Sequence, residues 1–112
     1  MKKIEAIIRP EKLEDVLNAL ESRGCSGLMI TDIEGYGKQK GMVHQWRGEK
    51  YKIDTLPKVK LEAVVKDSDL KDTVKTIVDN ARTGDIGDGK IFIHPVENSI
   101  RIRTGEEGEA IL

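Results

Sequence analysis

The sequence predicts a small α+β domain of the ferredoxin-like type, with the element order β-α-β-loop-β-α-β. Three observations favour this fold class: segments in which apolar and polar residues alternate, two segments with apolar residues at helical spacing, and Gly or Pro at the boundaries between them. In this fold both helices cover one face of the sheet. The 112 residues suit a single domain, residues 1–112, with a modest core.

The first half of the chain predicts a strand, a helix and a second strand. Residues 2–8 alternate in polarity, as a half-buried strand does. Pro10 opens a helix, where its missing N–H is not needed, and Gly24 ends it. Residues 28–36 are rich in β-branched and apolar side chains and predict the second strand. The apolar positions of the helix share one face: Leu13, Val16, Leu17 and Leu20.

The second half predicts the same order of elements. Residues 58–65 alternate and predict a strand with one apolar and one polar face. Residues 67–69, Asp-Ser-Asp, offer N-caps for a helix that ends before Gly84. Residues 91–96 predict a strand at an edge or bulge because they contain a proline, residues 100–104 a short extended piece, and the tail a loosely held end. The helix has an apolar stripe: Leu70, Val74, Ile77, Val78 and Ala81.

The segment from Gly37 to Leu56 has neither helical nor strand periodicity. A loop of this length inside a small domain is usually functional or disordered. It contains Trp46 and Tyr51, although the whole chain has only four aromatic residues, and Arg47 follows Trp46 directly. An exposed aromatic residue beside an arginine is typical of a binding anchor. We therefore predict that this segment binds a partner.

The composition argues against several classes of function. The net charge is −1 without a dominant basic patch, and Phe92 is the only aromatic residue on the predicted central strands, which argues against nucleic acid as a partner. The first residues lack the apolar run of a signal peptide, and no stretch is long enough to span a membrane. The single Cys25 cannot form an internal disulfide and fits a reducing compartment, so we expect a cytoplasmic protein.

The segment from Thr83 to Lys90, TGDIGDGK, is a candidate anion cradle. Its three glycines let backbone N–H groups turn toward an anion, and Lys90 adds positive charge at the rim. A Walker loop is excluded because Ile91 replaces the required Ser or Thr and the segment runs from helix to strand. From the residues alone, an anion cradle and a plain tight turn remain equally good interpretations.

Arg101 and Arg103 form a second candidate. Two residues apart on an extended segment, they share a face, and paired guanidinium groups suit a polyphosphate. A solvated strand face is the alternative. His44 and His94 lack the neighbours that a metal site needs, and no Ser-His-Asp or Cys-His grouping indicates a catalyst. A small phosphohydrolase is the enzyme alternative, and only the candidate cradle supports it.

Several segments together resemble the PII family of signal-transduction proteins, sensors of nitrogen and carbon status. The resemblance covers almost the whole chain. It implies that residues 37–56 correspond to the T-loop of the family, residues 82–90 to its B-loop and residues 101–106 to its C-loop. The segments that carry it are KKIEAIIRPEKLEDV, GYGKQKG, RGEKY, LPKVKLE, TGDIGDGKIF and RIRTGEEGEAIL.

The resemblance implies a homotrimer that binds ATP or ADP in each of three clefts between subunits. It also implies 2-oxoglutarate binding beside MgATP, with Gln39 as a magnesium ligand and Lys58 paired with a carboxylate. Lys40, Gly41 and Gly87 complete the implied 2-oxoglutarate site. The implied nucleotide-binding residues come from two neighbouring subunits: Ile7, Met29, Gly35, Gly37, Lys38, Gln39, Glu62, Val64, Ile86, Gly87, Asp88, Gly89, Lys90, Arg101 and Arg103.

The resemblance further implies a regulator instead of an enzyme, with at most slow ATP hydrolysis. Its ligands select the conformation of the long loop, which binds or releases an ammonium transporter or enzymes of nitrogen assimilation. A membrane is reached only through such a transporter. The implied partner contacts are Trp46, Arg47 and Tyr51, and Tyr51 is also a candidate site of uridylylation. The alternative is a PII-like regulator that senses adenylates together with a different small-molecule effector.

Overall fold

The structure, a computed structural model, describes the backbone of residues 1–36, 43–46, 49–52 and 55–112, and the side chains of residues 1–35 and 56–112. The elements follow one another as β1 (Lys2–Ile8), the 3₁₀ turn η1 (Pro10–Lys12), α1 (Leu13–Ser22), β2 (Met29–Tyr36), β3 (Val43–Trp46), β4 (Glu49–Lys52), β5 (Thr55–Val65), α2 (Asp67–Ala81), β6 (Lys90–Pro95) and the 3₁₀ turn η2 (Glu109–Ile111).

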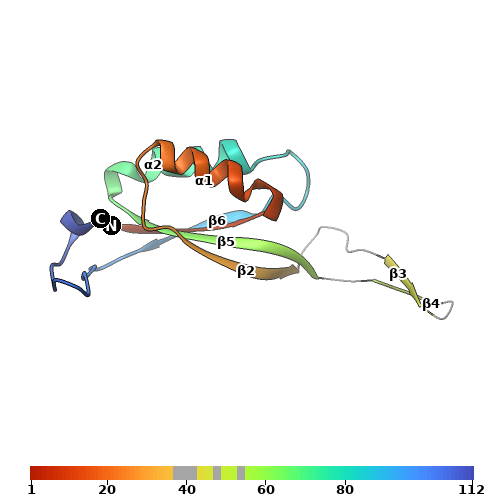
Figure 1. Cartoon of the computed structure of the whole chain (residues 1–112). Coiled ribbons are helices and arrows are strands. Elements are labelled where there is room, and N and C mark those ends of the chain that lie inside the picture. The colour runs from red at the N-terminus through yellow and green to blue at the C-terminus, as the bar shows by residue number, and fades with distance from the viewer. Residues whose placement is uncertain (37–42, 47–48, 53–54) are drawn as a thin grey trace.

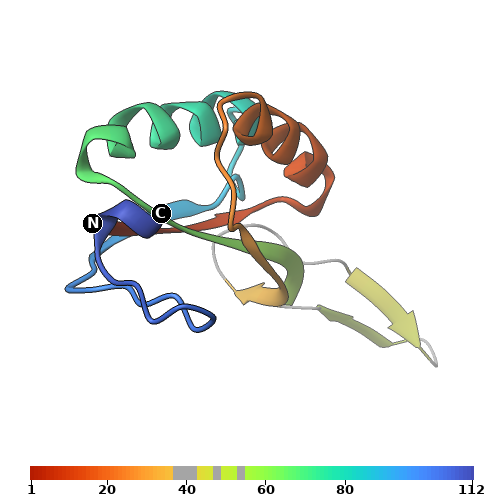
Figure 2. The same ribbon diagram turned by 60° about the vertical axis from the view of Figure 1, so that its left-hand side comes forward.

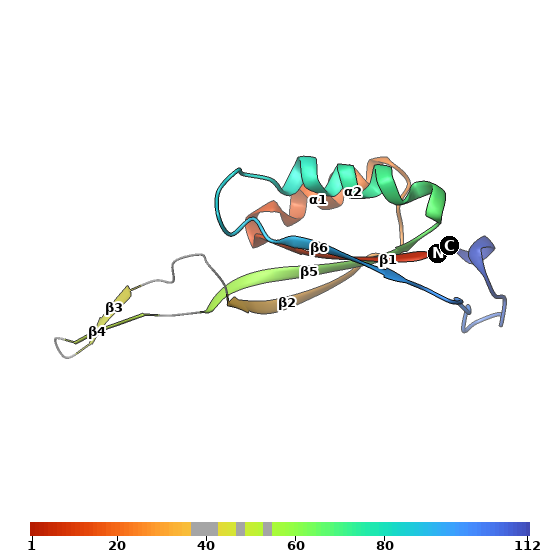
Figure 3. The ribbon, with the colours of Figure 1, turned by 180° about the vertical axis from the view of Figure 1, so that it is seen from behind.

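The main sheet contains four antiparallel strands in the order β2-β5-β1-β6. Helices α1 and α2 pack side by side over one face of this sheet, and the other face is open (Figure 1 and Figure 3). The two layers and the βαββαβ order confirm the predicted fold class. Among the described residues, no helix has the length and apolar character that a membrane crossing requires.

The core lies between the helices and the covered sheet face. The alternation of β1 is confirmed, because Ile4, Ala6 and Ile8 are buried. Burying an isoleucine side chain contributes roughly 1.5–3 kcal/mol, so a few large aliphatic residues hold the two layers together. The helices and β5 supply the rest of the buried cluster: Val16, Leu20, Val59, Leu61, Val65, Ile77 and Ala81.

Both helices begin differently from the prediction. Pro10 opens a 3₁₀ turn, and α1 itself begins at Leu13. The predicted aspartate N-cap of α2 is wrong, because Lys66 is the N-cap residue and no side chain caps the helix there. Asp67 is already helical and pairs with the N-terminal amine of Met1 at 3.1 Å. The acidic first turn is still favourable, because negative charge stabilises the N-terminal end of a helix dipole.

The long loop is not without strands, which corrects the prediction. β3 and β4 form an antiparallel pair of their own, with Val43 opposite Lys52 and Trp46 opposite Glu49. This pair lies beyond the ends of β2 and β5 (Figure 2). Because β3 and β4 form a sheet separate from the main one, their sequence need not show the alternation that identifies a half-buried strand.

The C-terminal segment is also more ordered than predicted. Residues 102–104 form a turn instead of an extended piece, and the amide of Gly105 donates to the carbonyl of Arg101 at 2.7 Å. The tail then folds back, since the amide of Gly108 donates to the carbonyl of Ser99 at 2.9 Å. Gly105 and Gly108 have φ angles of 73° and 89°, a conformation that favours glycine and makes this reversal accessible.

Candidate anion-binding site

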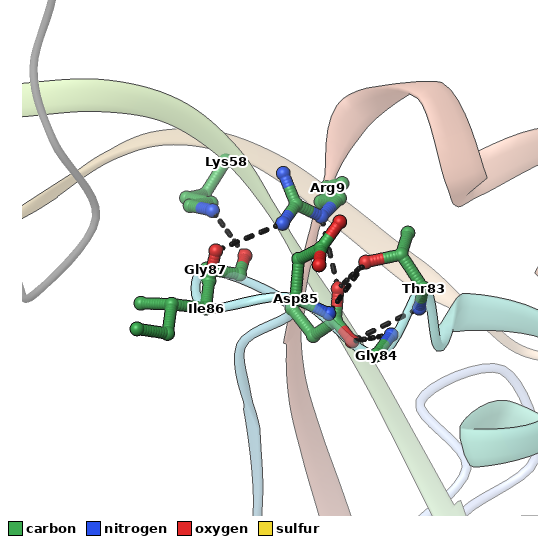
Figure 4. A network of polar contacts seen from close by, with 8 residues as sticks. Arg9, Lys58, Thr83, Gly84, Asp85, Ile86 and Gly87 are labelled. Atoms are coloured by element: carbon green, nitrogen blue, oxygen red, sulfur yellow. Dashed lines mark hydrogen bonds and ion pairs between the residues drawn. The ribbon is translucent and has the colours of Figure 1, made fainter.

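The glycine-rich loop, residues 82–90, connects α2 to β6 beside the end of β1 (Figure 4). Three of its residues, Gly84, Gly87 and Gly89, have φ angles of 95°, 104° and 96°. L-residues with a side chain rarely adopt such values. The loop can therefore fold back sharply within a few residues, and its peptide groups are free to point to either side.

The carboxylate of Asp88 organises the interior of this loop. Its Oδ1 accepts hydrogen bonds from the hydroxyl of Thr83 at 2.5 Å and from Nε of Arg9 at 3.0 Å. Its Oδ2 accepts from the amides of Thr83 at 2.9 Å and Gly84 at 2.8 Å. Both oxygens are engaged in this way, so the Asp88 side chain supports the loop. The predicted contact of Asp88 with a ligand is therefore expected from its backbone.

Asp88 should make the stability of the protein depend on acidity. The hydroxyl of Thr83 is the largest of several hydrogen-bonding causes that hold the pKa of Asp88 well below its usual range. A depressed folded-state pKa contributes stability above the unfolded value of about 3.9, and that stability disappears as the pH falls further. We therefore expect the stability gap between wild type and Asp88→Asn to narrow below about pH 4, as measured by urea unfolding at several pH values.

Asp85→Asn is the control for this titration. Asp85 lies in the same loop, and no described residue donates a hydrogen bond to its carboxylate. Asp85→Asn removes one negative charge from the same loop, so comparing the two variants isolates the effect of the hydrogen bonds that the Asp88 carboxylate accepts. A gap for Asp88→Asn that remained constant from pH 7 to pH 2 would contradict the assigned role of the carboxylate.

Two cations hold consecutive carbonyl groups of the loop. Nη2 of Arg9 donates to the carbonyl of Ile86 at 3.0 Å, and Nζ of Lys58 donates to the carbonyl of Gly87 at 2.5 Å (Figure 4). None of the described peptide bonds is cis, and in a trans peptide the N–H points opposite to the C=O. The amides of Gly87 and Asp88 therefore point away from the two cations, as the anion-cradle interpretation requires.

The base of the loop packs tightly on the sheet. A Cβ atom on Gly89 would lie 1.7 Å from the carbonyl oxygen of Ile7 in β1, so only glycine fits there. Lys58 is buried, and burial is the largest cause that lowers its pKa, with the charge of Arg9 adding to it. A Cβ on Gly35 of β2 would come within 2.9 Å of the Lys58 side chain. The strands thus fix both the loop and the lysine beside it.

The open sheet face carries a charged network around Glu62. Its carboxylate pairs with Lys3 at 3.3 Å and with Lys60 at 3.8 Å. Lys60 also reaches Glu5 at 3.8 Å, and Glu5 contacts His94 at 3.1 Å. Within the described residues no group of His, Cys, Asp and Glu is arranged to hold a metal ion. Because of its contacts with Lys3 and Lys60, Glu62 already has cationic partners.

Three further residues predicted to bind nucleotide share the open face with Glu62. Met29 is directly opposite Glu62 in the β2–β5 register, and Val64 lies two residues further along β5. Ile7 lies two residues from Glu5, which is opposite Glu62 in the β1–β5 register. Met29 is half exposed. The register thus gathers an apolar patch around one carboxylate.

Arg101 and Arg103 do not meet the glycine-rich loop within one chain. They lie beyond one end of β6, and the loop lies beyond the other (Figure 1 and Figure 3). A strand of six residues spans about 20 Å. Arg101 pairs with Glu106 at 3.1 Å and donates to the carbonyl of Ile111 at 3.4 Å. Because residues 102–104 form a turn, the shared face predicted from an extended segment is wrong.

Sequence analysis did not identify two residues that support the glycine-rich loop, Thr83 and Arg9. Thr83 was recognised only as the start of the glycine segment, and Arg9 was given no role. An arginine just before a helix-opening proline carries no local sign of a contact 79 residues away. Some of the predicted site residues lie outside the part of the chain that the structure describes: Gly37, Lys38, Gln39, Lys40, Gly41 and Arg47, and the side chains of Trp46 and Tyr51.

Comparison with known proteins gives a consistent result. The sequence profile of the family described as Nitrogen regulatory protein P-II matches residues 1–106. The chain is 58% identical over 109 residues to Nitrogen regulatory protein P-II 2 of Methanothermobacter thermautotrophicus, covering 97% of this chain and 95% of that protein. It is 54% identical over 109 residues to the P-II protein of Haemophilus influenzae, with 97% of each covered. Identity to P-II 1 of Escherichia coli K12 is 52% over 112 residues, all of both chains.

These similarities define the class of protein as a signal-transducing regulator and not an enzyme. The chain belongs to the P-II family of nitrogen regulatory proteins. The family expected from the sequence is thereby confirmed, together with its general role in nitrogen regulation.

Proposed function

We propose that this protein senses cellular energy, carbon and nitrogen status by binding ATP or ADP and 2-oxoglutarate, and that it regulates partners through the T-loop, residues 37–56. The observation that carries the proposal is the pair of carbonyls held by Arg9 and Lys58, which turns neighbouring amides outward. Successive outward N–H groups form an anion-binding concavity. Lys90, at the end of the same loop, adds a cation to bind the phosphates.

The nucleotide site is proposed to form between protomers of a homotrimer. Arg101 and Arg103 lie at the opposite end of β6 from the glycine-rich loop. The arginines and the loop of one chain therefore cannot bind the same phosphates. A head-to-tail ring brings the arginines of one copy to the loop of the next. In this arrangement Arg101 exchanges its contact with Glu106 for a phosphate oxygen.

The adenine is proposed to rest on the open sheet face. Ile7, Met29 and Val64 offer apolar contact, and Gly35 leaves room beside Lys58. Glu62 accepts a hydrogen bond from the exocyclic amine of the base. A carboxylate can do so while its other lone pairs keep the contacts to Lys3 and Lys60.

The 2-oxoglutarate site is proposed to lie between Lys58 and the T-loop. Burial lowers the pKa of Lys58, so an arriving carboxylate favours the charged ammonium and gains a strong partner. Lys58 also donates to Gly87, and the dicarboxylate therefore acts on the same loop as the phosphates. Gln39 is proposed to hold the magnesium ion that links the two ligands, and the backbone of Lys40, Gly41 and Gly87 to complete the site.

The T-loop is proposed as the partner-binding element. Its strands β3 and β4 lie beyond the ends of β2 and β5, and Trp46, Arg47 and Tyr51 are proposed to contact an ammonium transporter or nitrogen-assimilation enzymes. Tyr51 is also the candidate site of uridylylation. The protein is proposed to act in the cytoplasm, without nucleic acid, and to reach a membrane only through such a transporter.

Calorimetric titration of 2-oxoglutarate tests this function. We expect heat of binding with MgATP, and none with MgADP or without nucleotide. Gln39→Ala and Lys58→Ala should abolish the response, whereas Lys71→Ala, on the exposed surface of α2, should preserve it. Nucleotide binding without any 2-oxoglutarate response would contradict the effector assignment and support the alternative, an adenylate-responsive regulator with a different effector.

A further inference from the structure

We propose that Arg9 is a positioning residue for phosphate binding: it holds the peptide between Ile86 and Gly87, together with Asp88, so that the Gly87 amide faces the bound anion. The inference rests on the proposed function, since it concerns the same nucleotide site. It assigns to the residue between β1 and η1 a part in ligand binding that the sequence did not reveal.

The backbone of Arg9 is fixed on both sides. It follows β1 directly, and Pro10 after it restricts it to an extended conformation, which it adopts with φ −65° and ψ 138°. Its carbonyl accepts the amide of Lys12 at 3.0 Å, closing the 3₁₀ turn. The side chain is only 14% exposed. The guanidinium group therefore starts from a rigid base and needs little further ordering.

The guanidinium group uses two nitrogens on two different parts of the loop. Nε donates to the Asp88 carboxylate and Nη2 to the carbonyl of Ile86, both at 3.0 Å. A planar guanidinium fixes the angle between these donors, whereas a lysine ammonium is a single point of charge on a flexible stem. Arg9 thus sets the orientation of the loop against the sheet, whereas a lysine in its place keeps the charge but loses the fixed angle between the two donors.

Arg9 also has an electrostatic effect on the site. The Asp88 carboxylate lies within the loop that is proposed to receive a polyanion, and an unpaired negative charge there opposes phosphate binding. The ion pair with Arg9, at 3.0 Å, offsets that charge. Lys58 also interacts with the charge of Asp88, but its ammonium donates to the Gly87 carbonyl, whereas Arg9 is hydrogen-bonded to the carboxylate itself.

The test measures MgATP binding to the full-length protein by calorimetry for wild type, Arg9→Lys and Arg9→Met. Losing a charge-assisted hydrogen bond weakens binding roughly tenfold or more, so we expect at least that loss for Arg9→Met and a measurable loss for Arg9→Lys. The matched control is Arg23→Met, which removes another arginine–aspartate pair, Arg23–Asp72 at 3.6 Å, near the end of the two helices opposite to the loop. It should bind MgATP like wild type.

A second readout separates positioning from general stability. The Gly87 amide resonance should shift on adding MgATP to wild type and Arg23→Met, and should respond weakly or not at all in Arg9→Lys. If Arg9→Met does not fold, the folded Arg9→Lys decides the question by both readouts. Wild-type affinity together with a wild-type Gly87 shift in Arg9→Lys would overturn the positioning role. Absence of MgATP binding by wild type would instead overturn the proposed function, and this inference with it.

Discussion

Replacing Gly89 with alanine is expected to destabilise the folded protein by about 3 kcal/mol or more, because overpacking and an unfavourable backbone conformation act together. The new methyl group would lie 1.7 Å from the carbonyl oxygen of Ile7 and 2.7 Å from its carbonyl carbon. Both are backbone atoms of β1, and the neighbouring residue Lys90 is paired with Ile7 in the sheet. The clash therefore cannot be relieved without moving β6 or the loop. Chemical unfolding measures the stability, and calorimetry with MgATP measures the expected loss of binding.

Gly84→Ala is the matched control for this substitution. Gly84 has nearly the same φ angle, 95° against 96° for Gly89, but a methyl group added to it would have no described atom within 4 Å beyond its chain neighbours. It should cost only about 1–2 kcal/mol from the left-handed conformation. Equal losses for the two variants would show that backbone conformation alone matters, and would contradict the close approach of the loop to β1.

The layers of the fold were predictable because the buried positions of a strand or helix recur at a regular spacing in the sequence. Ile4, Ala6 and Ile8 alternate with polar residues since every second side chain of β1 points under the helices. Val16 and Leu20 follow the same logic on α1 with helical spacing. Such signals are local, and they depend only on which face of an element meets the core.

The site was predictable only where its chemistry is local. The glycine segment was recognised because Gly84, Gly87 and Gly89 are needed for the backbone conformation itself. The residues that support this loop were not recognised, because the contact of Arg9 with Asp88 joins residues that are far apart in sequence. The same holds for Lys58 and the Gly87 carbonyl, which meet only after β5 has found its place in the sheet.

The errors at the C-terminal segment and the long loop have a related physical cause. An Arg-Ile-Arg sequence satisfies strand alternation, but the backbone bond from Gly105 to Arg101 closes a turn instead. The strands β3 and β4 stabilise each other through backbone pairing, so their side chains need not follow a pattern set by a core. In both places backbone hydrogen bonds between neighbouring segments outweigh side-chain periodicity.

Truncating Ile4 to alanine is expected to destabilise the protein by about 2–5 kcal/mol, the range for removing a large aliphatic side chain from a packed core. Ile4 is 1% exposed in β1 and belongs to the buried cluster beneath the helices. The vacated volume is bounded by two strands and the helix layer, which relax only partly. Denaturant unfolding at equal protomer concentrations gives the loss, because oligomerisation makes apparent stability concentration-dependent.

Ile93→Ala tests whether burial is the cause. Ile93 is the cross-strand partner of Ile4 in the β1–β6 register, so the two side chains share a sheet face, but Ile93 is 48% exposed. It lines a cleft of about 340 Å³ between α2 and β6, which truncation only widens. We expect the loss to be well below that for Ile4→Ala when the two are compared in the same experiment. A larger loss at Ile93 would mean that this cleft is filled in solution, and a second copy of the chain packed against β6 is the occupant that the proposed trimer supplies.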